Sequence, residues 1–200
     1  MPTAAPMTFS TYDGAAPSKT WDAVTDLYVS TFSATPYEEN PADLALIATW
    51  GPAQLAQHSG RMTIAHRDQD VAGFALVHAL VHDEPWQTIL TAMAEHPAAS
   101  DALERPDRAL IVHELAVDEQ SRGQGIARTC LYEVLRDRNE EQVFIGVYDS
   151  ATDAVDMYRR WGLTQVGAFR GPDSNVTLLV LARPLQALRT RLQPTPNKQT

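Results

Sequence analysis

The chain has 200 residues, of which 44% are hydrophobic, and its 16 basic and 25 acidic residues give a formal net charge of −9. This length and apolar content are enough for one cored domain and argue against a second. The negative charge argues against a nucleic-acid groove and mildly favours cationic substrates, and the single cysteine, Cys130, excludes an intramolecular disulfide.

The first residues do not have the pattern of a secretion signal. Residues 1–14 (MPTAAPMTFSTYDG) lack the basic start and the unbroken apolar core of such a signal, and no apolar run approaches the length of a membrane span. We therefore expect a cytoplasmic protein without a membrane partner.

Up to about residue 58 the pattern predicts a weak strand over residues 7–12 and then helices. A helix over residues 18–32 would have an apolar side made of Trp21, Val24, Leu27, Tyr28 and Phe32. After the polar loop 33–41, Asn40 or Asp43 could cap a second helix that runs to about residue 58. We expect Gly51-Pro52 to interrupt that helix.

Residues 61–108 predict a hairpin, a helix and a loop. Residues 61–68 and 71–83 indicate two strands joined by a tight turn at 68–70. Residues 86–95 could form a helix, and residues 96–108, rich in turn formers, indicate a surface loop. His78 and His82 would lie on the same face of the strand, too far apart for a helical zinc pair. We find no metal-ligand spacing and expect no metal.

A strand that runs into a glycine turn and then into a helix follows at residues 109–135. Such a turn frees backbone N–H groups at the positive end of a helix dipole and suits a phosphate or pyrophosphate. Gly123 and Gly125 would let the backbone approach the ligand without a Cβ in the way. A dinucleotide fingerprint would need a third glycine where Arg128 stands, and no Gly-Lys-Ser/Thr triplet follows the turn.

The remaining chain predicts a strand from residue 142, a short helix that ends at Gly162, and another strand. Residues 184–200 are polar and contain prolines, which is typical of a mobile tail with at most one short helix around residues 185–192. We therefore expect one domain over residues 1–183 and a tail over 184–200.

Two blocks of this sequence resemble the GCN5-related N-acetyltransferase (GNAT) family. The first is Gln120-x-x-Gly123-x-Gly125 followed by Ile126 and Ala127, which resembles the acyl-CoA pyrophosphate loop; the second places Ala154 four residues before Tyr158 and ends at Gly162. The resemblance implies an α/β fold, with a mixed central β-sheet flanked by helices on both faces. It also implies that acetyl-CoA is the co-substrate.

The same resemblance assigns residues to the acetyl-CoA site. The main chain of Leu115, Ala116 and Val117 would contact the pantetheine arm. The pyrophosphate would lie against Gln120, Ser121, Arg122, Gly123, Gln124, Gly125, Ile126 and Ala127, and the site would be completed by Ala151, Ala154 and Tyr158. A basic patch near Arg122 and Arg128 could meet the CoA phosphates. Many relatives carry asparagine where this chain has Ala151.

The chemistry requires a base, because an alkylamine is mostly protonated at neutral pH and attacks a thioester only when neutral. Glu114 is the candidate, since a carboxylate in an apolar strand is costly unless it is paired or used. Strand alternation would put Val112, Glu114 and Ala116 on one face, with His113 on the other. The alternative for Glu114 is a salt bridge or solvation at a strand edge.

The departing CoA thiolate would benefit from a nearby hydroxyl donor. By resemblance Tyr158 is the general acid; the alternative is an aromatic side chain that only packs on its helix.

The acceptor pocket is less defined by the sequence. Tyr37, Glu38, Glu39 and Trp86 are candidate acceptor contacts, with carboxylates attracting a cation and rings supplying cation–π walls; the alternative is a solvated acidic loop.

We predict an acetyl-CoA-dependent N-acetyltransferase that acts on the primary amine of a small cationic molecule by direct attack on the thioester. The alternatives are a CoA-binding regulatory or interaction module without turnover and a protein N-terminal or lysine acetyltransferase. An aminoacyl transferase that uses tRNA would want a basic face that the net charge disfavours. Strand pairing at an exposed sheet edge would allow a homodimer.

Overall fold

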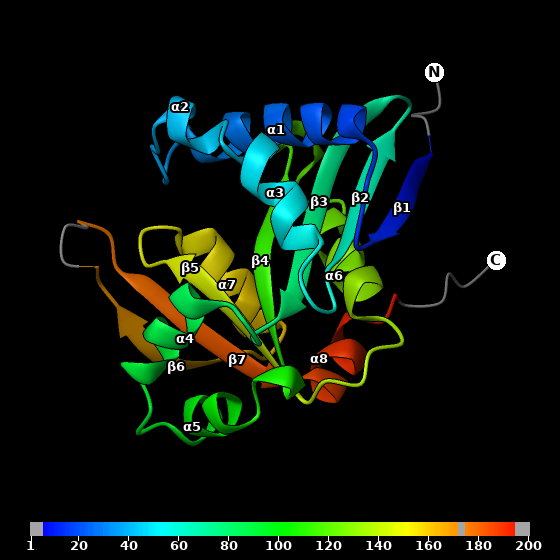
Figure 1. Cartoon of the computed structure of the whole chain (residues 1–200). Helices are drawn as coiled ribbons and strands as arrows, with labels where there is room; N and C mark the ends of the chain where they lie inside the picture. Colours follow the sequence, from blue (N-terminus) through cyan, green and yellow to red (C-terminus); the bar gives the residue numbers. More distant parts are fainter. Residues whose placement is uncertain (1–5, 172–174, 195–200) are drawn as a thin grey trace.

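In the computed structural model, which describes residues 6–171 and 175–194, the chain forms a seven-stranded sheet with helices on both faces (Figure 1). The strands are β1 (Met7–Asp13), β2 (Arg61–Arg67), β3 (Asp70–Ala79), β4 (Ala109–Val117), β5 (Gln142–Tyr148), β6 (Thr164–Phe169) and β7 (Leu178–Pro184), in the order β1-β2-β3-β4-β5-β7-β6. Neighbouring strands are antiparallel except β4 and β5, which are parallel. The mixed sheet expected from the sequence is confirmed.

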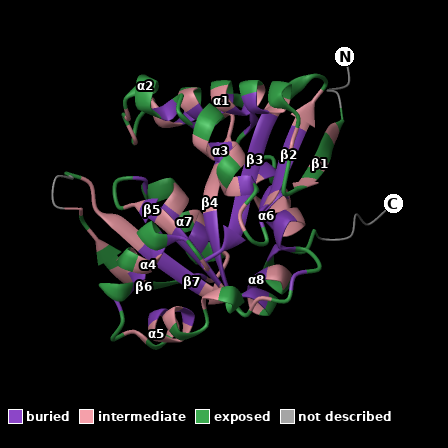
Figure 2. Ribbon diagram, in the orientation of Figure 1, coloured by how far each residue is buried: buried purple, intermediate pink, exposed green. Residues whose placement is uncertain are grey.

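The helices cover the two faces in separate groups. They are α1 (Ser18–Phe32), α2 (Pro41–Leu44), α3 (Ile47–Leu55), α4 (Glu84–Thr91), α5 (Pro97–Glu104), α6 (Ile126–Leu135), α7 (Thr152–Arg160) and α8 (Leu185–Leu192), with 3-10 turns η1 (Pro106–Arg108) and η2 (Glu119–Ser121). Helices α6, α7 and α8 share one core, α1, α2 and α3 a second, and α4 and α5 a third. The central strands between them are buried (Figure 2). None of the described helices is long and apolar enough to cross a membrane.

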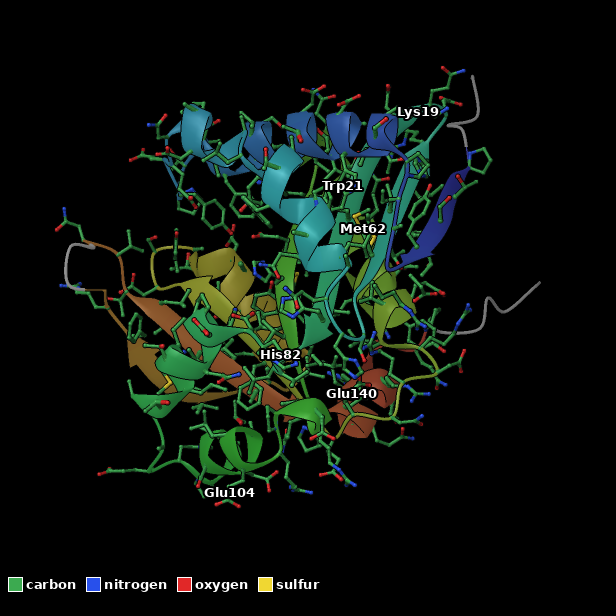
Figure 3. The ribbon with its side chains drawn as sticks, viewed as in Figure 1. Lys19, Trp21, Met62, His82, Glu104 and Glu140 are labelled. Atoms are coloured by element: carbon green, nitrogen blue, oxygen red, sulfur yellow. The ribbon has the colours of Figure 1, made fainter. Side chains whose placement is uncertain are left out.

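The first helix and the hairpin of β2 and β3 form as predicted, but the second predicted helix is interrupted elsewhere. The break falls at Ala45 and Leu46, between α2 and α3, whereas Gly51 and Pro52 lie inside α3. A Cβ at Gly51 would lie 2.4 Å from Cζ3 of Trp21, which is labelled in Figure 3. The glycine therefore serves the close packing of α3 on α1 rather than ending a helix.

The segment predicted as a surface loop, residues 96–108, is instead α5 followed by η1. His96 caps α5, because its Nδ1 accepts from the backbone N–H of Ala98 at 3.2 Å, and Pro97 occupies the first turn. Ala99 and Ala102 are buried against the sheet. The loop prediction was wrong, because in this stretch the turn formers stand at a helix start, where they cap and begin α5.

A β-bulge in β4 changes which side chains share a face. Leu76 of β3 pairs with Glu114, but the next residue, Val77, pairs with Val112, so His113 has no partner in the register. The extra residue inverts the alternation that follows it. Val112 thus packs in the core under α6, whereas Ala116 packs in the core under α1, and the prediction that they share a face was wrong.

The central strands separate just beyond this bulge. β4 and β5 are paired from Ala109 with Gln142 up to Val112 with Ile145, and no pairing continues from there to the strand ends. The backbone of residues 115–117 therefore has no strand partner on the β5 side within the described chain. This opening positions the candidate site.

The C-terminal segment is folded against the domain as far as the structure describes it. Leu185, Leu188 and Leu192 of α8 are buried in the core shared with α6. Arg128 donates hydrogen bonds to the carbonyls of Arg191, Leu192 and Gln193 at the end of α8. The short helix expected around residues 185–192 is present as α8, but it packs against the domain instead of forming part of a mobile tail, because leucines at helical spacing bury one side of this polar stretch. Residues 195–200 lie outside the described residues.

Candidate active site

A pocket of about 240 Å³ lies where β4 and β5 separate. Its walls come from α1, the loop after it, α4, the bulge of β4, the end of β5 and α7, and its lining residues are Tyr28, Phe32, Tyr37, Glu39, Trp86, Ile89, Val112, His113, Glu114, Leu115, Ile145, Gly146, Val147, Tyr148, Tyr158 and Leu178. Two carboxylates thus face a cavity with several aromatic side chains. Of the predicted site residues, the structure brings together Glu114, Tyr158, Leu115, Tyr37, Glu39 and Trp86 here.

The anion loop (residues 120–127) has the geometry that its glycines predict. Gly123 and Gly125 have φ angles of +75° and +79°, a region that other residues rarely adopt, and Gly125 is the N-cap of α6. A Cβ at either glycine would meet no atom within 4 Å, so the space beside the loop is open. Within the described chain, the backbone N–H groups of residues 123–127 have no hydrogen-bond partner. The loop can therefore donate to an anion at the N-terminus of α6.

Arg67, at the end of β2, is a residue that the sequence analysis missed. Its guanidinium donates to the Ser121 hydroxyl at 3.3 Å and to the Gln124 side-chain oxygen at 2.6 Å. It thereby ties the anion loop to the sheet and adds a positive charge beside it. The pairing register of the β2–β3 hairpin places Arg67 here, and no local motif around position 67 predicts this contact.

The expected basic patch is composed differently from the prediction. Arg122 remains at the anion loop, where its Nε donates to the Val117 carbonyl at 3.4 Å. Its charge also opposes the rise that burial causes in the pKa of Tyr37. Arg128 is committed to the end of α8 instead. The cations that the structure places at the loop are therefore Arg122 and Arg67.

Tyr158 projects from α7 into the pocket and is 6% exposed. Burial raises its pKa, and Tyr37 and Glu114 raise it further. Its hydroxyl makes no hydrogen bond to the part of the chain that the structure describes. The hydroxyl therefore stays protonated at working pH and is free to donate. Ala151 is the buried N-cap of α7, and the half-buried Ala154 of the same helix packs against the core.

Glu114 lines the same pocket from β4, next to the bulge. Its Oε1 accepts a hydrogen bond from the Tyr28 hydroxyl at 2.9 Å and lies 3.6 Å from Nδ1 of His113. Burial and then Glu114 raise the pKa of Tyr28, so this tyrosine remains a donor. The second carboxylate oxygen is left to accept a proton from a molecule in the pocket. Sequence reasoning missed Tyr28 as a site residue because its place in the apolar pattern of α1 indicated only packing.

The loop after α1 supplies a second carboxylate. Burial raises the pKa of Glu39, a hydrogen bond with Tyr148 opposes this, and Glu114 raises it further. Burial and then Glu39 raise the pKa of Tyr148 to about 12. Glu38, by contrast, is exposed, accepts from Thr35 at 3.1 Å and does not line the pocket.

Comparisons with known proteins agree with this architecture. The model of the acetyltransferase (GNAT) family matches residues 21–163. A comparison with curated proteins gave no significant match.

Among solved structures, the ribosomal-protein-alanine N-acetyltransferase from Brucella melitensis is similar with a TM-score of 0.62 at 17% identity, covering 88% of this chain and 99% of that chain. The Salmonella typhimurium protein yncA, solved with its cofactor acetyl-CoA, is similar with a TM-score of 0.62 at 13% identity, covering 90% and 95%. An N-acetyltransferase from Staphylococcus aureus Mu50 gives 0.59 at 17% identity, covering 90% and 99%. At these identities the likeness shows the fold.

Proposed function

Because the chain belongs to the acetyltransferase (GNAT) family, we propose that it transfers the acetyl group of acetyl-CoA to the primary amine of a small cationic acceptor. The observation that carries this proposal is the pocket at the opening between β4 and β5, which is lined by Glu114, Glu39 and Tyr158. In this proposal Tyr158 is the acid, Glu114 the base, and the anion loop the binding site of the acetyl-CoA phosphates.

The anion loop would hold the pyrophosphate of acetyl-CoA. Its free N–H groups, the open space beside Gly123 and Gly125, and the charges of Arg67 and Arg122 fit a dianionic group. The backbone of residues 115–117, unpaired on the β5 side, would contact the pantetheine arm. The thioester would then lie near the pocket between Glu114 and Tyr158.

The transfer needs two proton movements. The neutral amine attacks the thioester carbonyl carbon while Glu114 accepts the proton that the nitrogen loses. The C–S bond then breaks, and the departing sulfur takes the hydroxyl proton of Tyr158, which solvent later returns. Direct attack needs no covalent enzyme intermediate. Cys130 fits this account, because it is fully buried and burial raises the pKa of its thiol to about 12.

The preference for a cationic acceptor is inferred from the lining of the pocket. Two carboxylates attract a second ammonium group on the acceptor, and the rings of Tyr37, Tyr148 and Trp86 offer faces for cation–π contact. The small volume suits an alkylamine or the tip of a larger molecule.

A thiol-release assay with acetyl-CoA and a panel of amines tests this proposal. We expect turnover with a diamine or polyamine, with kcat/KM at least about tenfold higher than for a monoamine of the same length, because the second ammonium gains roughly 1.4 kcal/mol or more from the carboxylates. A higher salt concentration should reduce this difference in kcat/KM, because salt screens the attraction between the second ammonium and the carboxylates.

Two results would contradict the proposal in different ways. A preference for peptides with a free N-terminus or a lysine would favour a protein acetyltransferase. Saturable acetyl-CoA binding without turnover of any amine would favour a binding module.

A further inference from the structure

Three side chains that the proposed reaction does not use converge beside the pocket. They are His78 near the end of β3, Asp83 in the turn before α4, and His113 at the bulge of β4. Nε2 of His78 lies 3.4 Å from Oδ2 of Asp83, and one ligand atom from each of the three residues lies within 4.8 Å of the others. His78 and Asp83 are only 1% and 7% exposed.

Buried polar atoms of this cluster lack a hydrogen-bond partner within the described chain. Nδ1 of His78 lies 2.9 Å from the Ala79 carbonyl, and since a carbonyl only accepts, this nitrogen carries a proton. When the ring is neutral, Nε2 therefore presents a lone pair to the Asp83 carboxylate. Nε2 of His78, Oδ2 of Asp83 and Nδ1 of His113 are all buried without a hydrogen-bond partner in the described chain. Such an arrangement is costly unless a cation or a proton lies between these atoms.

The fold holds the Asp83 carboxylate in this position. Its Oδ1 caps α4 by accepting from the backbone N–H of Trp86 at 3.1 Å, which directs Oδ2 toward His78. The buried guanidinium of Arg138 is paired with Glu140 at 2.6 Å. A neutral ring is the form that binds a metal.

We propose that His78, Asp83 and His113 form a binding site for a divalent transition-metal ion, with Zn²⁺ as its representative. Two imidazole nitrogens and one carboxylate oxygen are a donor set that such ions use. Ligand atoms on a tetrahedral Zn²⁺ lie about 3.3 Å apart, given metal bonds of about 2.0–2.1 Å, and the distance from His78 Nε2 to Asp83 Oδ2 is 3.4 Å. His113, half-buried on the pocket wall, would supply the third ligand, since one of its ring nitrogens lies within 4.8 Å of the other two ligand atoms.

The site would tie the bulge of β4 to β3 and α4. Since His113 precedes Glu114, an ion held by His113 fixes the backbone that carries the proposed base. Further ligands would be waters that enter through the pocket, because His113 lines it. The spacing of positions 78, 83 and 113 matches no sequence motif, which is why the sequence analysis expected no metal.

The test is Zn²⁺ binding by chelator-treated full-length protein, measured by competition with a chromophoric chelator and without acetyl-CoA. We expect one tight equivalent in the wild type and a rise in Tm on Zn²⁺ addition. Asp83→Asn and His113→Gln should each weaken Zn²⁺ binding by more than about 100-fold. This exceeds the loss expected for a residue that only hydrogen-bonds to a metal ligand. Asn is as good an N-cap as Asp, so Asp83→Asn should keep α4 folded.

His58→Gln is the matched control, because it removes an exposed imidazole outside the cluster and should bind Zn²⁺ as the wild type does. With Co²⁺ in place of Zn²⁺, the visible absorption spectrum should show bands with the intensity of a four-coordinate site. The Asp83→Asn variant should lack these bands. Equal Zn²⁺ affinity in wild type and Asp83→Asn, or no tight equivalent at all, would overturn the proposal and leave a proton shared by His78 and Asp83. Because no substrate is present, either result is independent of the acetyl-transfer proposal.

Discussion

Replacing Tyr158 by phenylalanine is expected to lower kcat for acetyl transfer by about 10²-fold or more, the range for loss of a positioned proton donor. The hydroxyl of Tyr158 has no hydrogen bond to the described residues, so its removal breaks no hydrogen bond of the protein there. The KM for acetyl-CoA should therefore change little. Because burial raises the pKa of Tyr158 above its ordinary value, the hydroxyl stays protonated and the loss should be the same from about pH 6 to pH 9.

Tyr132→Phe provides the control for this prediction. Tyr132 lies on α6, packs against the same core as Tyr158, and does not line the pocket, so its rate should match the wild type. Steady-state thiol release across pH measures both variants. An unchanged kcat in Tyr158→Phe would show that the sulfur leaves without this donor and that Tyr158 only packs.

Replacing Glu114 by glutamine is expected to lower kcat/KM by about 10² to 10³-fold, because the amide cannot accept the amine proton. Glutamate and glutamine side chains are nearly isosteric. In the wild type the Tyr28 hydroxyl lies 2.9 Å from Oε1 of Glu114, and the amide oxygen of the variant can still accept this hydrogen bond. The fold should therefore persist. If Glu114 is the base, the acid limb of the wild-type pH profile should be absent in the variant.

Two further variants test whether the effect is specific to Glu114 or follows from the removal of any carboxylate. Glu104→Gln removes an exposed carboxylate on α5, labelled in Figure 3, and should leave the profile unchanged. Glu39→Gln should raise the KM of a cationic amine but keep the acid limb. If the limb disappeared in Glu39→Gln and persisted in Glu114→Gln, Glu39 would be the base and Glu114 a binding residue.

The parts of this fold that the sequence predicted are those set by local chemistry. The strand, glycine turn and helix around Gly123 and Gly125 could be predicted because positive φ angles and an anion-binding helix start follow from a few adjacent residues. α1 was predicted with its bounds, because five apolar residues recur at helical spacing. Tyr158 was placed by resemblance, and the structure puts it in the pocket.

The parts that could not be predicted depend on pairing between distant segments. The bulge at His113 is defined by the register of β3 against β4, and nothing in the local sequence distinguishes it from a regular strand. Arg67 reaches the anion loop across 54 residues of sequence, and Tyr28 reaches Glu114 across 86. The helix at residues 185–192 was expected, but its packing against the domain was not, since its leucines become core residues only when α6 lies beneath them.

Calorimetric titration with acetyl-CoA, and with CoA as the comparison, tests the central claim most directly. The wild type should show saturable binding at one site. Gly125→Ala should bind at least about tenfold more weakly, because a Cβ strains the left-handed backbone by about 1–2 kcal/mol and displaces the N–H groups that meet the pyrophosphate. Gly14→Ala places the same strain at a φ angle of +72° outside the anion loop and should bind normally. Absence of saturable binding in the wild type, or equal binding in Gly125→Ala, would contradict the account, because the anion loop would then be only a turn between strand and helix.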